Sequence, residues 1–474
     1  MLWLALQLPR LSLEVFERGN AAGLPLAVAD GERLVAANTP ALRGGVRAGM
    51  APAAARALVP GLELRCRDSA AEDRALRQVA AWALQFTATL SLAPPAALLL
   101  EVGRSLRYFG GLEVLRGRLE RGLAELGYRQ INAVAPTPGA ALLLARAGDQ
   151  TPVTRPEALA QRLGALPVQV LELTRERSEA LASLGIQHLA QCLALPRAGL
   201  ARRLGPGLLR QLSQALGESP DIRPAWHAPS RFCSRLELPA PSRDAAPLLF
   251  ACARLLRELA GYLEGRQLGV QRLRLRLIHE DQTCTPCGVG LVAPSRTLGH
   301  LLELVRSRLE RLCLPAAVTA LELDAVELRP LDPASLPLLE EAPGRDRSRL
   351  LVDRLAARLG ERTVQGLQVR DEHRPEQAWG YAPAADAGDD DGPALERPLW
   401  LLPRPWPLPV AGHQPLWHGP LVLRSGPERI EGGWWDGQDV VRDYYVAANP
   451  AGERLWVFQD RSAERAWFLH GIFA

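Results

Sequence analysis

An alternating row of arginines is the clearest chemical pattern in the chain. The stretch Gln271–Ile278, QRLRLRLI, predicts a β-strand with leucines on one face and Arg272, Arg274 and Arg276 on the other. A guanidinium is a planar fork that matches phosphate oxygens, so this row suits a surface lying along a nucleic-acid backbone. A sheet face exposed only to solvent is the alternative that the same pattern allows.

A second basic cluster flanks a glycine-rich turn in the segment LARRLGPGLLRQL. Gly205, Pro206 and Gly207 form the turn, and the arginines beside it are Arg202, Arg203 and Arg210. Backbone N–H groups at such a turn meet phosphates at the N-terminus of the following helix. We therefore predict non-specific contact with a DNA backbone here. An ordinary corner between two helices is the alternative.

The cysteines do not predict a metal centre or a disulfide framework. Seven cysteines, an odd number, are scattered over a long chain. Cys284 and Cys287 form one C-x-x-C motif, but zinc sites of this kind need a second pair of ligands. His279 and Cys313 are not at a convincing ligand spacing. We therefore expect no metal and no cofactor.

Length and composition indicate a soluble protein of several domains. The 474 residues are enough for three or more cores, and 56 basic against 52 acidic residues give a net charge of +4. Every basic residue is Arg. The apolar start MLWLALQLPRL lacks a basic leader and is interrupted by Pro9, so it predicts a buried strand rather than a signal peptide. No uncharged apolar run reaches the roughly 18 residues of a membrane span, and we expect a cytoplasmic protein.

Hydrophobic periodicity predicts the elements of the first 165 residues. Three apolar runs of strand length are Leu2–Leu8, Ala96–Val102 and Ile131–Ala135. A hairpin turning at Asp30-Gly31 is expected between the first two. The expected helices are Glu14–Arg18, Asp73–Leu92, Leu112–Leu126 and Thr137–Ala147.

Two segments within the first 165 residues resemble Y-family (UmuC-like) translesion DNA polymerases. The stretch SLAPPAALLLEVGRSLRYFGG resembles the second catalytic strand of the palm, and GVRAGM followed by a helix resembles the fingers signature. The family carries an Asp-Glu pair in that palm strand and an Asp-x-Asp pattern in the first strand. The corresponding positions here are Ala96 and Ala97, and Leu6 and Leu8. Since two-metal phosphoryl transfer needs several converging carboxylates, the resemblance implies a polymerase fold that is not an enzyme.

Contacts to the incoming triphosphate are also missing from the aligned positions. The family's Tyr and Arg in the fingers correspond to Thr39 and Leu42, and its second palm Lys corresponds to Leu142. An active polymerase with unusual ligands is the alternative, for which Glu101 and Glu14 are the only nearby acids. Two acids cannot hold two metal ions.

The resemblance implies an α+β multidomain fold, a polymerase-like right hand with an added β-rich domain. The implied domains are palm and fingers 1–165 (fingers about 21–75), helical thumb 166–225, little finger 226–330, linker 331–397 and C-terminal domain 398–474. The little finger is expected in the order strand–helix–strand–strand–helix–strand.

The linker contains a sequence similar to peptides that bind the bacterial sliding clamp. Those peptides begin with Gln and continue with apolar anchors. The corresponding residues here are Ser335, Leu336, Pro337, Leu338 and Leu339. Because Ser replaces Gln, a plain linker is an equal alternative.

Seven of the 11 tryptophans fall in the last 77 residues. The strings GPERIEGGWWDGQDVVRDYYVA and WFLHGIFA resemble the C-terminal module of the ImuB group, inactive Y-family homologues. This resemblance implies a role in SOS mutagenesis at the nucleoid, with DNA, the β sliding clamp, an ImuA-like RecA-related protein and an error-prone C-family polymerase as partners. A DNA-binding module without a clamp is the alternative. Aromatics in a small domain mostly form its core, but exposed ones would anchor partners. The candidate anchors are Trp434, Trp435, Trp456 and Trp467.

Overall fold

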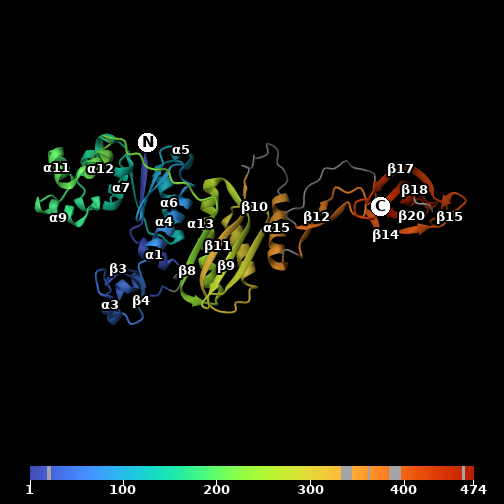
Figure 1. Ribbon diagram of the computed structural model, residues 1–474, viewed down its shortest axis with the longest axis horizontal. Coiled ribbons are helices and arrows are strands. Elements are labelled where there is room, and N and C mark those ends of the chain that lie inside the picture. Colours follow the sequence, from blue (N-terminus) through green and yellow to red (C-terminus); the bar gives the residue numbers. More distant parts are fainter. Residues whose placement is uncertain (19–22, 332–343, 361–362, 384–396, 462–464, 474) are drawn as a thin grey trace. The chain divides into compact units, whose positions relative to one another are not determined.

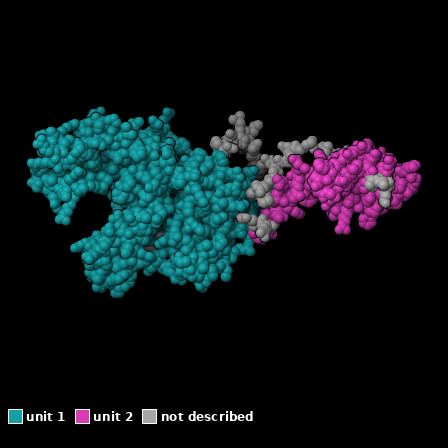
Figure 2. Space-filling model, viewed as in Figure 1, with its two compact units in different colours: residues 1–358 teal, residues 359–474 magenta. Residues whose placement is uncertain are grey.

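The computed structural model describes residues 1–18, 23–331, 344–360, 363–383, 397–461 and 465–473. The chain forms two compact units, residues 1–358 and residues 359–474 (Figure 2). A search of the described helices finds none with the length and apolarity of a membrane span.

The first unit begins with a four-stranded antiparallel sheet, the palm (Figure 1). Its strand order is β5-β6-β1-β7, with bounds Leu90–Ala93, Ala97–Glu101, Trp3–Gln7 and Ile131–Ala135. Helices α4 (Ser69–Ala83) and α6 (Leu112–Leu126) bury one face, and α7 (Pro138–Ala147) buries the other. Burial on both faces explains why the central strand reads as a continuous apolar run.

Local signals set the ends of several palm helices. Gly127, with φ +86°, ends α6 in the left-handed conformation that favours glycine. The side chain of Thr137 accepts a hydrogen bond from the N–H of Ala140 and so caps α7. The prediction of a helix over Asp73–Leu92 was wrong at its end, because α4 stops at Ala83 and residues 90–93 pair with β6 instead.

The fingers are a small three-stranded sheet with short helices. The strand order is β3-β2-β4, with bounds Arg33–Ala37, Leu26–Asp30 and Glu63–Cys66. The helices around it are α1 (Leu11–Glu17), α2 (Thr39–Arg43) and α3 (Pro52–Leu58). Asp30 pairs with Arg33, so the hairpin turns at Gly31 and Glu32, one residue later than predicted.

The thumb is helical and shares a hydrophobic core with α7. Its α-helices are α8 (Leu159–Gly164), α9 (Arg175–Ser183), α10 (Leu189–Ala194), α11 (Arg197–Leu204) and α12 (Pro206–Leu216). The hydroxyl of Thr137 donates to the carbonyl of Ala215 at 2.7 Å, which ties α12 to the start of α7. A short helix, α5 (Leu106–Phe109), lies between β6 and α6.

The little finger has the predicted order of elements. The sequence runs β8 (Cys233–Ser242), α13 (Ala245–Arg266), β9 (Leu268–His279), β10 (Cys284–Ser295), α14 (Leu298–Leu309) and β11 (Val318–Pro330). The sheet order is β10-β9-β11-β8, and α13 and α14 share its hydrophobic core. Helix α15 (Gly344–Leu359) is fixed to it by Asp353, which contacts His300 Nε2 at 2.9 Å and accepts from the N–H of Val292.

The second unit is built almost entirely of strands. Its five-stranded antiparallel sheet has the order β14-β20-β19-β18-β17, with bounds Trp400–Leu408, Trp467–Ile472, Arg454–Asp460, Val440–Ala448 and Val422–Gly432. Two small hairpins accompany it, β12 (Gln365–Val369) with β13 (Trp379–Pro383) and β15 (Val410–Ala411) with β16 (Gln414–Pro415). The segment predicted as a linker contains α15, where the sequence predicts a helix over Arg347–Leu359, and also a β-hairpin that was not predicted.

Candidate functional site

The resemblance to Y-family polymerases predicts the family's metal site on the palm face around Ala97. Directly opposed residues of an antiparallel pair share a face, and here Gln7 opposes Ala97 and Ala5 opposes Leu99. Ala5, Ala97 and Leu99 pack in the core that includes α7. The first-strand residues that share this face are therefore Trp3, Ala5 and Gln7, and Glu101 of β6 lies on it as well.

Leu6 and Leu8 lie on the other side of the sheet. Both are fully buried in the core formed with α4 and α6. Contrary to the prediction, Leu6 and Leu8 do not share a site with Ala97, because neighbouring residues of a strand point to opposite faces, and Ala5 and Gln7 are the β1 residues beside Ala97. Ala96 lies in the turn before β6, where its carbonyl accepts the N–H of Leu8 at 2.8 Å.

Apart from Glu101, the described residues of β1 and β6 on this face have no side chain suited to binding divalent metal. Mg²⁺ is held mainly by carboxylates, whereas Ala5, Ala97 and Leu99 are aliphatic and Gln7 is a neutral amide. Within the described ranges, no group of three or more His, Cys, Asp or Glu residues is placed to hold a metal ion.

The two nearby acids are far apart and already have partners. Glu101 ends β6 beside Trp3, and its carboxylate accepts the N–H groups of Leu2 and Gly103 at 3.3 and 3.1 Å. Glu14 accepts the N–H of Arg129, next to the other end of β1. The two ends of this five-residue strand are about 13 Å apart at 3.3 Å per residue. The acids therefore do not converge on one site.

The aligned triphosphate-contact positions carry no charge. Thr39 and Leu42 are exposed on α2 in the fingers, and Leu142 is buried in the core beneath α7. None of these side chains can form an ion pair with a phosphate.

The glycine turn of the thumb lies between α11 and α12 and is open to solvent. Gly205, with φ +87°, ends α11 and precedes Pro206, the first residue of α12, and Gly207 is exposed. The flanking arginines are all exposed and have no hydrogen-bond or ion-pair partner in the described part of the chain: Arg202, Arg203 and Arg210. The guanidinium of Arg177 lies near the same turn, since a Cβ on Gly205 would be 3.2 Å from its Nη2. The sequence pattern missed Arg177 because it comes from another helix, α9.

The arginine row of β9 is exposed as predicted, but the structure adds acids beside it. The row pairs with β11 so that Arg272, Arg274 and Arg276 face Glu327, Asp324 and Glu322. Arg276 forms an ion pair with Glu322, and Asp324 is engaged by Arg231. Arg272 and Arg274 have no ion pair among the residues that the structure describes.

On its other side, the arginine row adjoins a flat strip of β10. Gly288 opposes Arg274 and Gly290 opposes Arg272. The absence of side chains there leaves space beside the two unpaired guanidinium groups. The useful cations of the predicted row are therefore Arg272 and Arg274, and Arg276 is largely neutralised.

The C-x-x-C motif does not form a metal site. Cys284 is exposed and Cys287 is buried in the little-finger core, because a spacing of three residues puts two side chains on opposite faces of a strand. Burial raises the pKa of the Cys287 thiol to about 11. His279 is buried and contacts the Ala316 carbonyl and the Thr285 hydroxyl at 3.0 and 2.8 Å. Cys313 is exposed and free.

The four candidate tryptophan anchors divide into two pairs. Trp456 and Trp467 are buried in the core of the C-terminal sheet, so the structure corrects their prediction as partner contacts. Trp434 and Trp435 are 79% and 56% exposed on the loop between β17 and β18. That loop is held by Arg374, whose side chain is only 2% exposed.

Arg374 forms a compact support for this tryptophan loop. Its guanidinium bonds to Glu372 and Asp436, both at 2.7 Å, and lies 5.5 Å from the ring of Trp435. The sequence missed Arg374 because its partners are far apart along the chain. The clamp-like peptide Ser335–Leu339 lies outside the described residues.

A family model identifies the class of the N-terminal part of the chain. A family model described as the impB/mucB/samB family, a UmuC-like Y-family domain, matches residues 11–146. These residues include most of the palm and fingers, so this part of the chain is Y-family polymerase-like.

The match to curated relatives extends over nearly the whole chain. Protein ImuB of Caulobacter vibrioides strain NA1000 is 30% identical over 459 residues, which cover 90% of this chain and 100% of the relative. The same protein from strain ATCC 19089 matches equally. The chain therefore belongs to the ImuB family.

Solved Y-family structures are also similar. The Dbh ternary complex is 18% identical with a TM-score of 0.40 and covers 70% of this chain and 100% of its own. DinB from Sulfolobus solfataricus is 18% identical with a TM-score of 0.38, and the match covers 69% of this chain and 98% of DinB.

Proposed function

We propose that this protein is a non-catalytic adaptor in error-prone translesion DNA synthesis. It binds DNA backbone without sequence preference and links the β sliding clamp, an ImuA-like protein and an error-prone C-family polymerase at damaged DNA. The observation that carries the proposal is the palm face at Ala97, where a polymerase would need several carboxylates and Ala5, Gln7 and Leu99 are present instead. Glu101 is the one acid of β1 and β6 on that face, and its carboxylate accepts the N–H groups of Leu2 and Gly103.

Two exposed basic surfaces support the DNA contacts. The thumb turn presents backbone N–H groups of Gly207 and three unpaired arginines, and β9 presents Arg272 and Arg274 beside a glycine strip. Arginine forks without a carboxylate partner are available to phosphates.

Family membership and two features of the chain support the proposed protein partners. Trp434 is exposed on the loop that Arg374 supports, and it suits a partner anchor because hot spots of interfaces are enriched in tryptophan. The segment Ser335–Leu339 supplies a clamp-like peptide.

Primer extension tests the non-catalytic assignment. We expect no extension of a primed template by the purified protein with Mg²⁺ or Mn²⁺. Template-dependent extension that is abolished by Glu101→Ala would refute this assignment.

Electrophoretic mobility shift on primed duplex DNA tests the little-finger contact. Arg272→Glu/Arg274→Glu should weaken binding and reduce its salt dependence, since each lost phosphate contact lowers the slope of log K against log salt by about 0.9. Arg276→Glu is the matched control, because this arginine is already paired with Glu322 and should matter less. Equal binding by the double variant and the wild type at low salt would exclude this surface.

A clamp pull-down separates the adaptor from a DNA-binding module without a clamp. Leu338→Ala/Leu339→Ala should abolish retention on immobilised β clamp while DNA binding is kept. Unchanged retention would exclude this peptide as the anchor, and no retention of the wild type would favour the module.

A further inference from the structure

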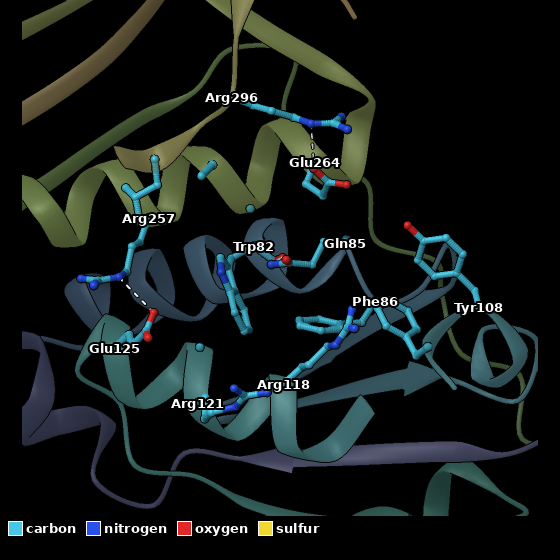
Figure 3. Close-up of a pocket in the computed structure, with 15 residues that line it drawn as sticks. Trp82, Gln85, Phe86, Tyr108, Arg118, Arg121, Glu125, Arg257, Glu264 and Arg296 are labelled. Carbon is cyan, nitrogen blue, oxygen red and sulfur yellow. Dashed lines mark hydrogen bonds and ion pairs between the residues drawn. The ribbon is translucent and has the colours of Figure 1, made fainter. Parts of the chain in front are cut away.

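Two adjoining cavities form a groove between the palm helices and the little finger. One, of about 480 Å³, is lined mainly by α4, α6 and α13. The other, of about 570 Å³, is lined by the end of α4, α5, residues 226–228 and the end of α13. Both are lined by Gln85, Phe86, Tyr108 and Phe109, so these residues stand where the cavities meet. Figure 3 shows the first cavity, with Gln85, Phe86 and Tyr108 labelled. We call the two cavities together the Tyr108 groove.

The Tyr108 groove is separate from the DNA-contact surfaces proposed above. It lies on the α4 and α6 side of the palm sheet, whereas Ala97 faces α7. Neither the thumb turn nor the exposed face of β9 lines it.

Close packing beneath the groove fixes its two walls. Trp82 of α4 is wedged between Gly122 of α6 and Gly261 of α13: a Cβ on these glycines would lie 2.3 and 2.1 Å from the indole. Only glycine allows this approach. The palm wall and the little-finger wall therefore keep one spacing.

The groove carries an excess of positive charge. Its lining contains two carboxylates, and each is already paired: Glu125 with Arg257 at 3.1 Å and Glu264 with Arg296 at 2.8 Å (Figure 3). Four further arginines line it without a carboxylate partner among the described residues: Arg104, Arg118, Arg121 and Arg266. The local excess of four charges equals the net charge of +4 of the whole chain. An anionic occupant is therefore favoured.

Tyr108 is the most exposed Phe, Tyr or Trp ring of the groove, and Trp226 at the second cavity is partly exposed. Tyr108 is 80% exposed and packs edge-on against Phe109 at 4.9 Å between ring centroids. By contrast, Trp82, Phe86 and Phe109 are each at most 8% exposed. An amphipathic peptide needs several apolar anchoring surfaces, and these three nearly buried rings offer it little. A highly exposed ring among arginine forks fits a base stacked between bound phosphates.

We propose that the Tyr108 groove binds single-stranded DNA, with one base stacked on Tyr108 and flanking phosphates held by Arg118 and Arg121. The strand is single because stacking on a side chain requires a base released from its duplex neighbours. This site is additional to the backbone contacts of the proposed function, and neither depends on the other.

Fluorescence anisotropy with a labelled oligothymidine of about 16 nucleotides tests the proposal on the full chain. Tyr108→Ala should raise Kd by about 5-fold to 100-fold, the loss of one base–aromatic stack, whereas Tyr108→Phe keeps the ring and should leave Kd unchanged. Arg118→Ala/Arg121→Ala should lower the slope of log K against log salt by about 1.4, or about 0.7 for each phosphate contact. All three side chains are exposed or lie on the groove rim, so the variants are expected to fold, as circular dichroism will verify.

Arg404→Ala/Arg424→Ala is the matched control, since it removes two exposed arginines from the other unit and should leave the slope unchanged. Wild-type Kd and slope in both Tyr108→Ala and Arg118→Ala/Arg121→Ala would overturn the proposal. Tyr108-dependent binding of a labelled Asp/Glu-rich peptide, with oligothymidine binding unaffected by the variants, would overturn it in favour of a protein partner. Loss of oligothymidine binding with primed-duplex binding intact supports this site and leaves the proposed function standing.

Discussion

Removing Glu258 should loosen the little finger from the palm. Glu258, on α13, is 2% exposed and forms an ion pair with Arg18 at the end of α1, which is 5% exposed. Arg18 also donates to the carbonyl of Leu126 at 2.8 Å and to the hydroxyl of Tyr128 at 2.7 Å. Burial alone would lower the pKa of Arg18, but the attraction of Glu258 raises this pKa above its ordinary value.

The expected loss in the free energy of unfolding follows from the charge that stays buried after the substitution. In Glu258→Gln the guanidinium of Arg18 keeps only neutral acceptors, and breaking one partner of a buried pair costs about 3–5 kcal/mol. In Arg18→Met/Glu258→Gln no charge remains buried, so the cost should be at least about 2 kcal/mol less than the sum of the two single changes. The matched control is Glu179→Gln in the exposed pair Arg175–Glu179, where about 0.5 kcal/mol or less is expected.

Two measurements check this reasoning. Urea unfolding followed by circular dichroism gives the free energies for the double-mutant cycle, and hydrogen exchange of peptides from α13 reports local opening of the little finger. Exchange in α13 should accelerate in Glu258→Gln and stay at the wild-type rate in Glu179→Gln. Additive single changes, or a cost of Glu258→Gln below about 1 kcal/mol, would refute the argument.

Three further predictions concern packing and pH. Gly261→Ala should destabilise the first unit by about 1–3 kcal/mol in urea unfolding because its Cβ would strike Trp82, whereas Gly299→Ala, with open space around it on α14, should stabilise by up to about 1 kcal/mol. Burial raises the pKa of Glu14 to about 7, so the folded state holds this proton more tightly than the unfolded state does. The free energy of unfolding should therefore fall by at most about 3 kcal/mol as pH rises from about 4.5 to 7. Glu14→Gln should remove this pH dependence in unfolding curves, and a variant with the wild-type pH dependence would contradict the assignment. Burial lowers the pKa of His470 to about 4, so the second unit should lose stability as pH falls from 6.5 towards 4; thermal melts of His470→Phe should lose that acid sensitivity, and a wild-type acid response would exclude His470 as its source.

Local sequence signals determined most element types. The helix Leu112–Leu126 and the strand Ile131–Ala135 have the predicted bounds, because a hydrophobic period followed by a glycine such as Gly127 is a local property. The element order of the little finger was also readable, since its strands alternate and its helices are long. The end of α4 at Ala83 was missed, because only the pairing of residues 90–93 with β6 distinguishes strand from helix there.

What the sequence by itself determined, then, was where strands and helices form and where chemically useful residue types occur, because periodicity and residue type act locally. Which of them meet was decided only by the tertiary structure. Strand register put Ala5 rather than Leu6 on the Ala97 face, and it set Glu322 against Arg276. Burial of Trp456 and the position of Tyr108 between two domains depend on partners far away in the chain, whose pairing no local pattern encodes.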